Sequence, residues 1–134
     1  MLEIDPEIVY FLILKARAFD DKDEPGGIDP DAGRAEAVRH RTMRYVDGDP
    51  VAQEIDDTIA VLNEDQQAEL VALAWLGRGD FTAEEWAEAV RTARERRTAS
   101  TAEYLLGTPL LGDYLEEGLA QLGFAVEDLE PARA

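Results

Sequence analysis

The chain contains no cysteine and one histidine, His40, among its 134 residues. Without cysteine there is no disulfide scaffold, no thiolate nucleophile and no cysteine-ligated zinc or iron–sulfur centre. Serine is equally scarce, because Ser100 is the only one. A serine-based triad would have to use His40 as its base, and nothing marks an acid that would orient that pair. With phosphate-binding glycine loops also absent, the sequence favours a non-catalytic protein with no cofactor.

Basic charge is scarce as well, with 13 Lys and Arg against 30 Asp and Glu and a formal net charge of −17. Binding of DNA or RNA requires a basic surface, and an anionic membrane also repels an acidic protein. The longest apolar run, Ile8–Leu14, is far shorter than the roughly 20 residues of a membrane span. Acidic rather than basic residues precede it, unlike in a signal peptide. We therefore expect a cytoplasmic protein that binds neither nucleic acid nor membrane.

Helix start signals are frequent along the chain. Asp5-Pro6 and Asp49-Pro50 each place a capping side chain before a proline at the first helical position. Three further pairs have capping spacing: Asn63 with Gln66, Thr82 with Glu85, and Ser100 with Glu103. We expect helices over 6–19, 50–62, 64–77, 83–97, 100–106 and 109–122. The sequence predicts an all-α fold, a compact bundle of five or six helices.

The domain organisation follows from the same signals. A single helical domain is expected over residues 1–130, with an acidic loop at 20–31 and a frayed tail at 131–134. The helix that contains Ile8–Leu14 has no polar face before Lys15, so we expect it to be the central, surrounded helix. A buried strand is the competing interpretation of this run. The segment 34–46 could form a helix, but its apolar positions fit no period cleanly.

The segment LGRGDFTAEEW at 76–86 outlines an EF-hand-like helix–turn–helix. In that register Gly79 and Glu85 take the glycine and terminal glutamate positions of the loop, but Ala74, Leu76 and Arg78 stand where early oxygen ligands belong. Calcium needs six to eight oxygens, so we predict a helix–turn–helix without calcium ligands. Gly77 or Gly79 would stop the first helix with positive φ, and both tryptophans would be largely buried. The residues with expected structural roles are Trp75, Gly77, Gly79, Phe81, Thr82, Glu85 and Trp86.

The acidic loop carries four carboxylates, Asp21, Asp23, Asp29 and Asp31, at spacings close to those of a calcium loop. Pro25 and Ala32 replace the fifth ligand and the bidentate acid of that loop. These four side chains could hold a divalent metal ion weakly, which would relieve their mutual repulsion. A solvated connection is the favoured alternative, since runs of like charge are mostly exposed.

Two basic clusters interrupt the acidic background. The second, Arg91 to Arg97, is explained by helix-internal pairs and by the negative end of the helix dipole. The first consists of Arg39, His40, Arg41 and Arg44, with Arg34 nearby, and has no such explanation. It either binds an anion or an acidic partner or neutralises the acidic loop, because arginine makes bidentate contacts with carboxylate and phosphate.

Two segments carry a family resemblance. LAWLGRGDF at 73–81, followed by Glu85-Trp86, resembles the central segment of the family named domain of unknown function 3775. YLLGTPLLGDYL at 104–115 is similar to its C-terminal segment, and the resemblance covers roughly residues 50–120. It implies a helical fold and a bacterial origin, and it supplies no catalytic residue.

These observations make a non-catalytic protein-interaction or regulatory module the leading hypothesis for function. The partner would be another protein or an anionic ligand, and a homodimer is an open option. The alternative is a weak divalent-metal or small-ligand binding protein that uses the acidic loop 20–31.

Overall fold

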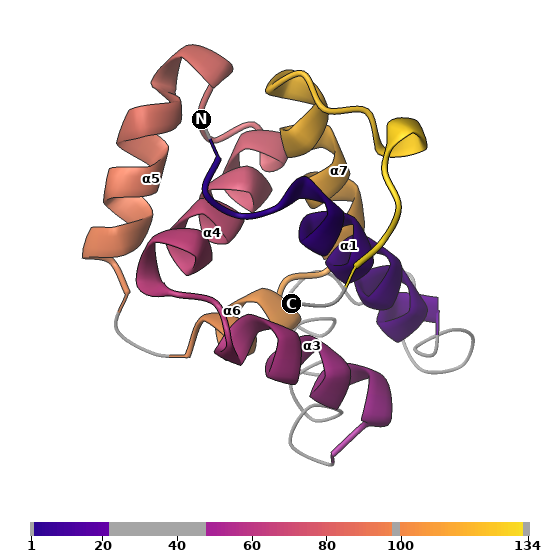
Figure 1. Cartoon of the computed structure of the whole chain (residues 1–134). Coiled ribbons are helices and arrows are strands. Elements are labelled where there is room, and N and C mark those ends of the chain that lie inside the picture. Colours follow the sequence, from indigo (N-terminus) through magenta and orange to yellow (C-terminus); the bar gives the residue numbers. More distant parts are fainter. Residues whose placement is uncertain (1, 22–47, 98–99, 133–134) are drawn as a thin grey trace, which may run out of the picture.

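The computed structural model describes residues 2–21, 48–97 and 100–132 (Figure 1). In these ranges the chain forms helices and no strand, so the predicted all-α fold is confirmed. The helices are α1 (Pro6–Asp21), α3 (Pro50–Ala60), α4 (Glu64–Arg78), α5 (Trp86–Glu95), α6 (Thr101–Leu106) and α7 (Leu111–Gln121), with 3-10 helices η1 (Ala83–Glu85) and η2 (Val126–Asp128). Across the described part of the chain, every helix is too short or too polar to cross a bilayer.

Two of the predicted helix starts, before α3 and α4, carry the expected capping hydrogen bonds. The Asp49 carboxylate accepts hydrogen bonds from the backbone N–H groups of Val51 and Ala52 at 2.9 and 3.2 Å. Asn63 and Gln66 form a reciprocal capping box at the start of α4, with bonds of 2.8 and 3.0 Å. These caps satisfy backbone donors that a helix N-terminus would otherwise leave without partners.

Two later starts use the same chemistry. Glu85 accepts the backbone N–H of Thr82 at 2.8 Å, and the Ser100 hydroxyl accepts the N–H of Glu103 at 3.2 Å. The expected helix over 83–97 begins with η1 and continues as α5. Gly79 ends α4 with φ +96°, whereas Gly77 lies inside that helix.

The most enclosed helix is α4, which packs against α7, α5 and α6 and runs through the middle of the molecule in Figure 1. Every residue from Gln67 to Leu76 is buried. The first helix, α1, is a helix as predicted, but the expectation that it is the central one is wrong. Among the described helices it packs on α7 and α3, and Leu14 is 40% exposed.

Hydrogen bonds explain how α4 buries polar side chains. The Gln67 amide donates to the carbonyls of Ile59 and Leu62 at 3.0 and 3.1 Å. The Glu69 carboxylate accepts backbone N–H groups from the chain that enters α1. A buried polar group is tolerated when its hydrogen bonds are made. Gln67 and Glu69 therefore make the sequence of α4 look less hydrophobic than that of a typical buried helix, although both side chains are buried.

Helix α7 starts later than predicted. The expected start at Thr108-Pro109 is wrong, because α7 begins at Leu111. The Thr108 hydroxyl instead donates back to the Tyr104 carbonyl of α6 at 3.2 Å. Leu110 then takes a left-handed conformation with φ +63° immediately before α7.

The C-terminal segment returns to the start of the chain (Figure 1). The backbone N–H of Glu130 donates to the Glu7 carboxylate, and the N–H of Ala132 donates to the Glu7 carbonyl, both at 3.1 Å. Residues 131–132 follow this return, and the expected fraying of the tail stays a prediction. Residues 133–134 lie outside the described ranges.

Candidate functional site

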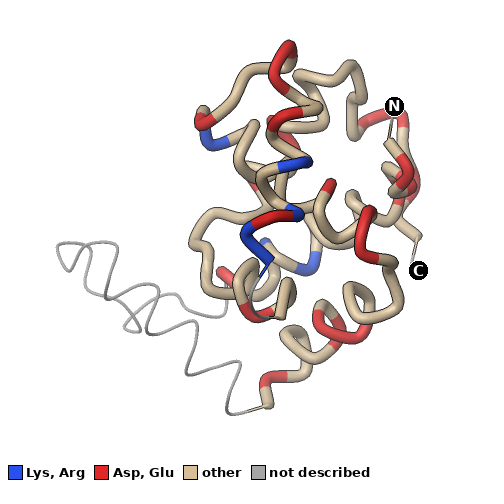
Figure 2. Tube along the Cα trace, turned by 90° about the vertical axis from the view of Figure 1, so that its left-hand side faces the viewer, with Lys and Arg blue, Asp and Glu red and all other residues tan. Residues whose placement is uncertain are grey.

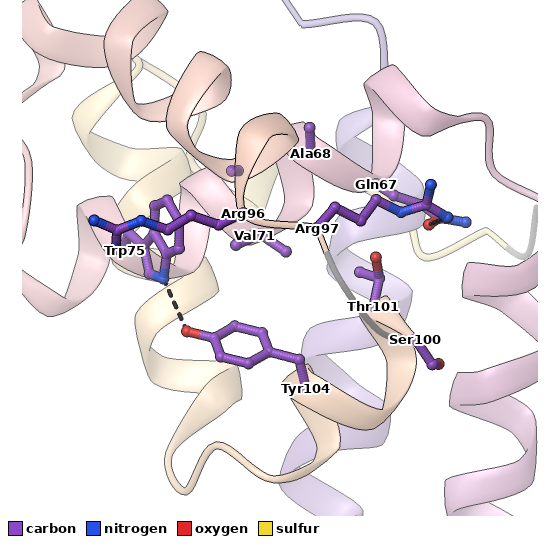
Figure 3. Close-up of a pocket in the computed structure, with 10 residues that line it drawn as sticks. Gln67, Ala68, Val71, Trp75, Arg96, Arg97, Ser100, Thr101 and Tyr104 are labelled. Carbon is purple, nitrogen blue, oxygen red and sulfur yellow. Dashed lines mark hydrogen bonds between the residues drawn. The ribbon is translucent and has the colours of Figure 1, made fainter.

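A pocket of about 300 Å³ lies between α4, the end of α5 and α6 (Figure 3). Its apolar wall consists of Ala68, Val71 and Trp75 from α4, with Ala93 from α5. The three α4 residues are spaced by three and four positions, which places them on one face of the helix. That face is therefore occupied by apolar side chains that α5 and α6 do not fully cover.

Trp75 is fixed in this wall by two contacts. Its indole N–H donates to the Tyr104 hydroxyl at 2.9 Å, and its ring stacks on Phe81 with centroids 5.8 Å apart. Figure 3 shows Trp75 and Tyr104 pointing toward each other from α4 and α6. Trp75 is 8% exposed, whereas Tyr104 is 44% exposed. The pair thus presents a pre-oriented aromatic surface at the pocket.

The Tyr104 hydroxyl has donor capacity that the fold does not use. Its oxygen accepts a hydrogen bond from the indole N–H of Trp75, and its own O–H group has no acceptor among the described residues. Tyr104 also lies close enough to Arg78 to contribute to the pKa of that arginine. The hydrogen bond to Asp80 raises the pKa of Arg78 above its ordinary value, burial opposes the rise, and Tyr104 adds to it.

The end of α5 brings arginines to the opposite side of the pocket. Arg97 donates to the Gln67 side chain at 3.0 Å and to the Glu64 carboxylate at 3.2 Å. Arg94 pairs with Asp65 at 2.6 Å. The C-terminal end of α5 therefore meets the acidic N-terminal turn of α4, a favourable arrangement of charges and helix dipoles.

Arg96 differs from these neighbours. It lines the pocket and is exposed, and within the described residues it makes no ion pair or hydrogen bond through its side chain. An arginine presents five N–H donors in a planar fork. The pocket therefore combines an apolar wall with one uncommitted cation.

The pocket lies in the part of the chain that matches a protein family. Residues 52–124 match the model described as a protein of unknown function (DUF3775). The chain belongs to the DUF3775 family. The match includes every residue that lines the pocket and confirms the resemblance seen in the sequence. Searches of curated proteins and of solved structures found no match.

The predicted structural residues of the DUF3775 region lie close to the pocket. Trp75 is buried as expected, and Phe81 stacks on it. The expectation that Trp86 is largely buried is wrong, since it is only partly buried against the core. It begins α5, which packs on α4.

Two predicted sites stand outside the described residues. The basic cluster of Arg39, His40, Arg41 and Arg44 lies outside them, as do Asp23, Asp29, Asp31 and the side chain of Asp21. Both sites therefore remain predictions. Among the side chains that the structure describes, no group of three or more potential metal ligands comes together.

Sequence reasoning did not find this DUF3775 pocket. The spacing of charges on α5 predicts pairs within one helix for Arg91 and Arg94. Arg91 does pair with Glu88, whereas Arg94 pairs with Asp65 of α4. A signal was present in the spacing of Ala68, Val71 and Trp75 on one helical face. That pattern alone indicates burial, and it does not show that the covering helices leave a gap.

Proposed function

We propose that this chain is a non-catalytic interaction module that binds an acidic segment of another protein at the pocket between α4, α5 and α6. The observation that carries the proposal is the uncommitted Arg96 beside an apolar wall, in a chain of net charge −17. Figure 2 looks onto the α5 side, where blue Lys and Arg segments lie close together with red segments between and around them. Most of these arginines pair with neighbouring acids, whereas Arg96 has no partner among the described residues and can attract an acidic group locally.

The residue types of the site also support binding. Trp, Tyr and Arg are enriched among the interface residues that dominate binding energy, and Trp75, Tyr104 and Arg96 are of these types. The hydrogen bond between Trp75 and Tyr104 orients both rings in advance. Less side-chain freedom is then lost on association, which favours affinity.

The hydroxyl groups of the pocket do not form a nucleophile–base pair. Ser100 uses its oxygen to accept the N–H of Glu103, and the described residues that line the pocket include no histidine and no carboxylate. A general base within hydrogen-bond reach of the nucleophile is required for its activation. This composition supports recognition rather than catalysis.

The absence of cysteine allows a direct test. A Ser100→Cys variant places a unique thiol at the pocket for a benzophenone crosslinker, and Val61→Cys places one on a 66% exposed residue that does not line the pocket. In a lysate of the source organism, we expect the label at residue 100 to crosslink an acidic segment of a partner protein. Peptide mapping by mass spectrometry identifies that segment.

A second substitution makes the result specific. Adding Arg96→Glu to the Ser100→Cys chain should suppress the crosslink, because it places a negative charge where the partner's carboxylates would bind. Circular dichroism establishes that each variant is folded. Equal crosslinking from residues 61 and 100, or an unchanged crosslink with Arg96→Glu, would contradict the proposal.

A further inference from the structure

We propose that the pocket recognises one apolar group that carries a single carboxylate, such as an aryl or short alkyl carboxylic acid, free or at the C-terminus of a peptide. This inference rests on the site of the proposed function and specifies the chemistry that it selects. Three features of the pocket carry it: its size, its donors and its charge.

The size and lining favour a small apolar group. A volume of about 300 Å³ is at the lower end of the range for small-molecule sites. The wall of Ala68, Val71 and Trp75 offers no hydrogen bond into the pocket except through the indole N–H, which Tyr104 already accepts. A phenyl ring or short alkyl chain fits this wall, whereas a polar body would lose its hydration without compensation.

The unused polar groups are donors. Arg96 has an uncommitted guanidinium, and Tyr104 has an O–H proton without an acceptor in the described part of the chain. A ligand that satisfies both must supply acceptor oxygens. A carboxylate does so with two oxygens, and arginine matches its geometry with two parallel bonds.

The single uncommitted cation of the pocket favours one negative charge on the group that enters it, whatever charges the rest of a longer ligand carries outside. The other arginine of the pocket, Arg97, already donates to Gln67 and Glu64. A phosphate-bearing ligand would bring a second negative charge into a chain of net charge −17 without a second free cation. We therefore expect the pocket to prefer a monocarboxylate over a phosphate monoester.

Trp75 provides the readout. The full chain with Trp86→Phe has one tryptophan, so its emission reports the pocket. The probe is 3-phenylpropionate, and the comparison compounds are its neutral amide and phenyl phosphate. We expect 3-phenylpropionate to change the emission with a dissociation constant on the order of 0.1–1 mM, typical of so small a ligand. The amide and the phosphate should bind about tenfold more weakly or worse.

Matched variants connect the signal to the two donors. In the Trp86→Phe background, Arg96→Gln should weaken 3-phenylpropionate about tenfold, and Tyr104→Phe should weaken it about threefold. Arg91→Gln is the control, because Arg91 lies on the helix that Arg96 caps, pairs with Glu88 and does not line the pocket. It should leave the affinity unchanged. Thermal unfolding establishes that each variant is folded.

A peptide arm separates the two sources of the ligand. The probe is a short acidic peptide that ends in phenylalanine, with a free or an amidated C-terminus. Binding of the free acid and of the carboxylate form of the peptide supports both the inference and the proposed function. Binding of the free acid alone supports the ligand class and contradicts a protein partner. The inference is overturned if neither carboxylate binds, if the amide binds equally, or if Arg96→Gln has no effect.

Discussion

Gly77 on α4 lies directly against the backbone carbonyl of Tyr114 on α7. A Cβ atom built on Gly77 would stand 1.8 Å from that oxygen. The contact is reciprocal, because a Cβ on Gly118 of α7 would stand 2.2 Å from the carbonyl oxygen of Leu73 on α4. The two helices therefore cross with their backbones in contact. At 3.6 residues per turn, Leu73 and Gly77 lie opposite Val71 and Trp75, so α7 supports α4 from behind the pocket.

Because of this contact, a glycine-to-alanine change here should destabilise the protein, whereas inside a helix it usually stabilises. Inside an ordinary helix, alanine is more stable than glycine by about 0.5–1 kcal/mol. At Gly77 the added methyl group would collide with the Tyr114 carbonyl. We expect Gly77→Ala to lower the free energy of unfolding by about 2 kcal/mol or more, because overpacking forces backbone shifts. Urea denaturation followed by circular dichroism measures it.

The control for this change is Ala120→Gly on the exposed face of α7. It should cost about 1 kcal/mol through helix propensity alone. Gly118→Ala should destabilise in the same way as Gly77→Ala. A Gly77→Ala protein more stable than the unmodified chain would mean that α4 and α7 are farther apart than the structure places them.

The chain before α1 depends on a single carboxylate of α4. Glu69 accepts the backbone N–H groups of Glu3 and Ile4, each at 2.8 Å, and is 5% exposed. Glu69→Gln keeps the shape but replaces one acceptor oxygen with a donor. We expect a loss of about 1–3 kcal/mol in the free energy of unfolding, the cost of leaving buried donors unsatisfied.

Hydrogen exchange locates this effect. The amide of Ile4 should exchange faster in Glu69→Gln, while amides in the middle of α5 should change only as much as global stability does. Glu84→Gln is the control, since Glu84 is exposed in η1. An Ile4 amide that stays equally protected would show that Glu69 does not hold the entry to α1.

The sequence predicted the features that depend on residues close together in the chain. Asn63 and Gln66 are three residues apart, and their capping box requires nothing beyond its own backbone. Glu69 is different, because its partners Glu3 and Ile4 are more than 60 residues away. Its burial follows from tertiary packing, so from sequence it resembles any exposed helical glutamate.

The candidate site was missed for the same physical reason. Trp75 was expected to be buried, but its bond to Tyr104 joins residues 29 positions apart. Whether an arginine of α5 is paired depends on which acidic residues of α4 lie beside it. The sequence does not show how α4 and α5 pack against each other. Leu110 shows a further limit, since a leucine with φ +63° contradicts its local preference and is imposed by the join between α6 and α7.

Arg17 connects α1 to α7 through Asp113 and Glu116, with N–O distances of 3.0 and 2.7 Å. Burial, the largest single influence, lowers the pKa of Arg17, but these two partners together raise it above its ordinary value. A raised pKa means that the stabilisation is complete below the ordinary value and is lost only as pH rises through the raised value.

The contribution of Arg17 should therefore be constant between about pH 6 and pH 10. Because all three side chains are partly exposed, Arg17→Met should cost at most about 1 kcal/mol, and the loss should shrink in high salt. Urea denaturation of both proteins at several pH values and salt concentrations gives the difference. A difference that varies strongly over this pH range would point to another titrating group.

The two tryptophans should differ sharply in their contribution to stability. Trp75 is buried, stacks on Phe81 and donates to Tyr104. Trp75→Ala should cost about 3–5 kcal/mol, the usual cost of truncating a buried aromatic side chain. Trp86 is only partly buried at the start of α5, so Trp86→Ala removes less apolar surface from the core and should cost about 1–2 kcal/mol.

Trp75→Phe separates packing from the hydrogen bond. It keeps an aromatic ring against Phe81 but removes the indole N–H that Tyr104 accepts. We expect the free energy of unfolding to fall by about 1–2 kcal/mol, which is less than the fall expected for Trp75→Ala. Thermal and urea unfolding of the three variants gives their order. If Trp86→Ala lowers the free energy of unfolding as much as Trp75→Ala does, Trp86 contributes more to the core than its partial burial indicates.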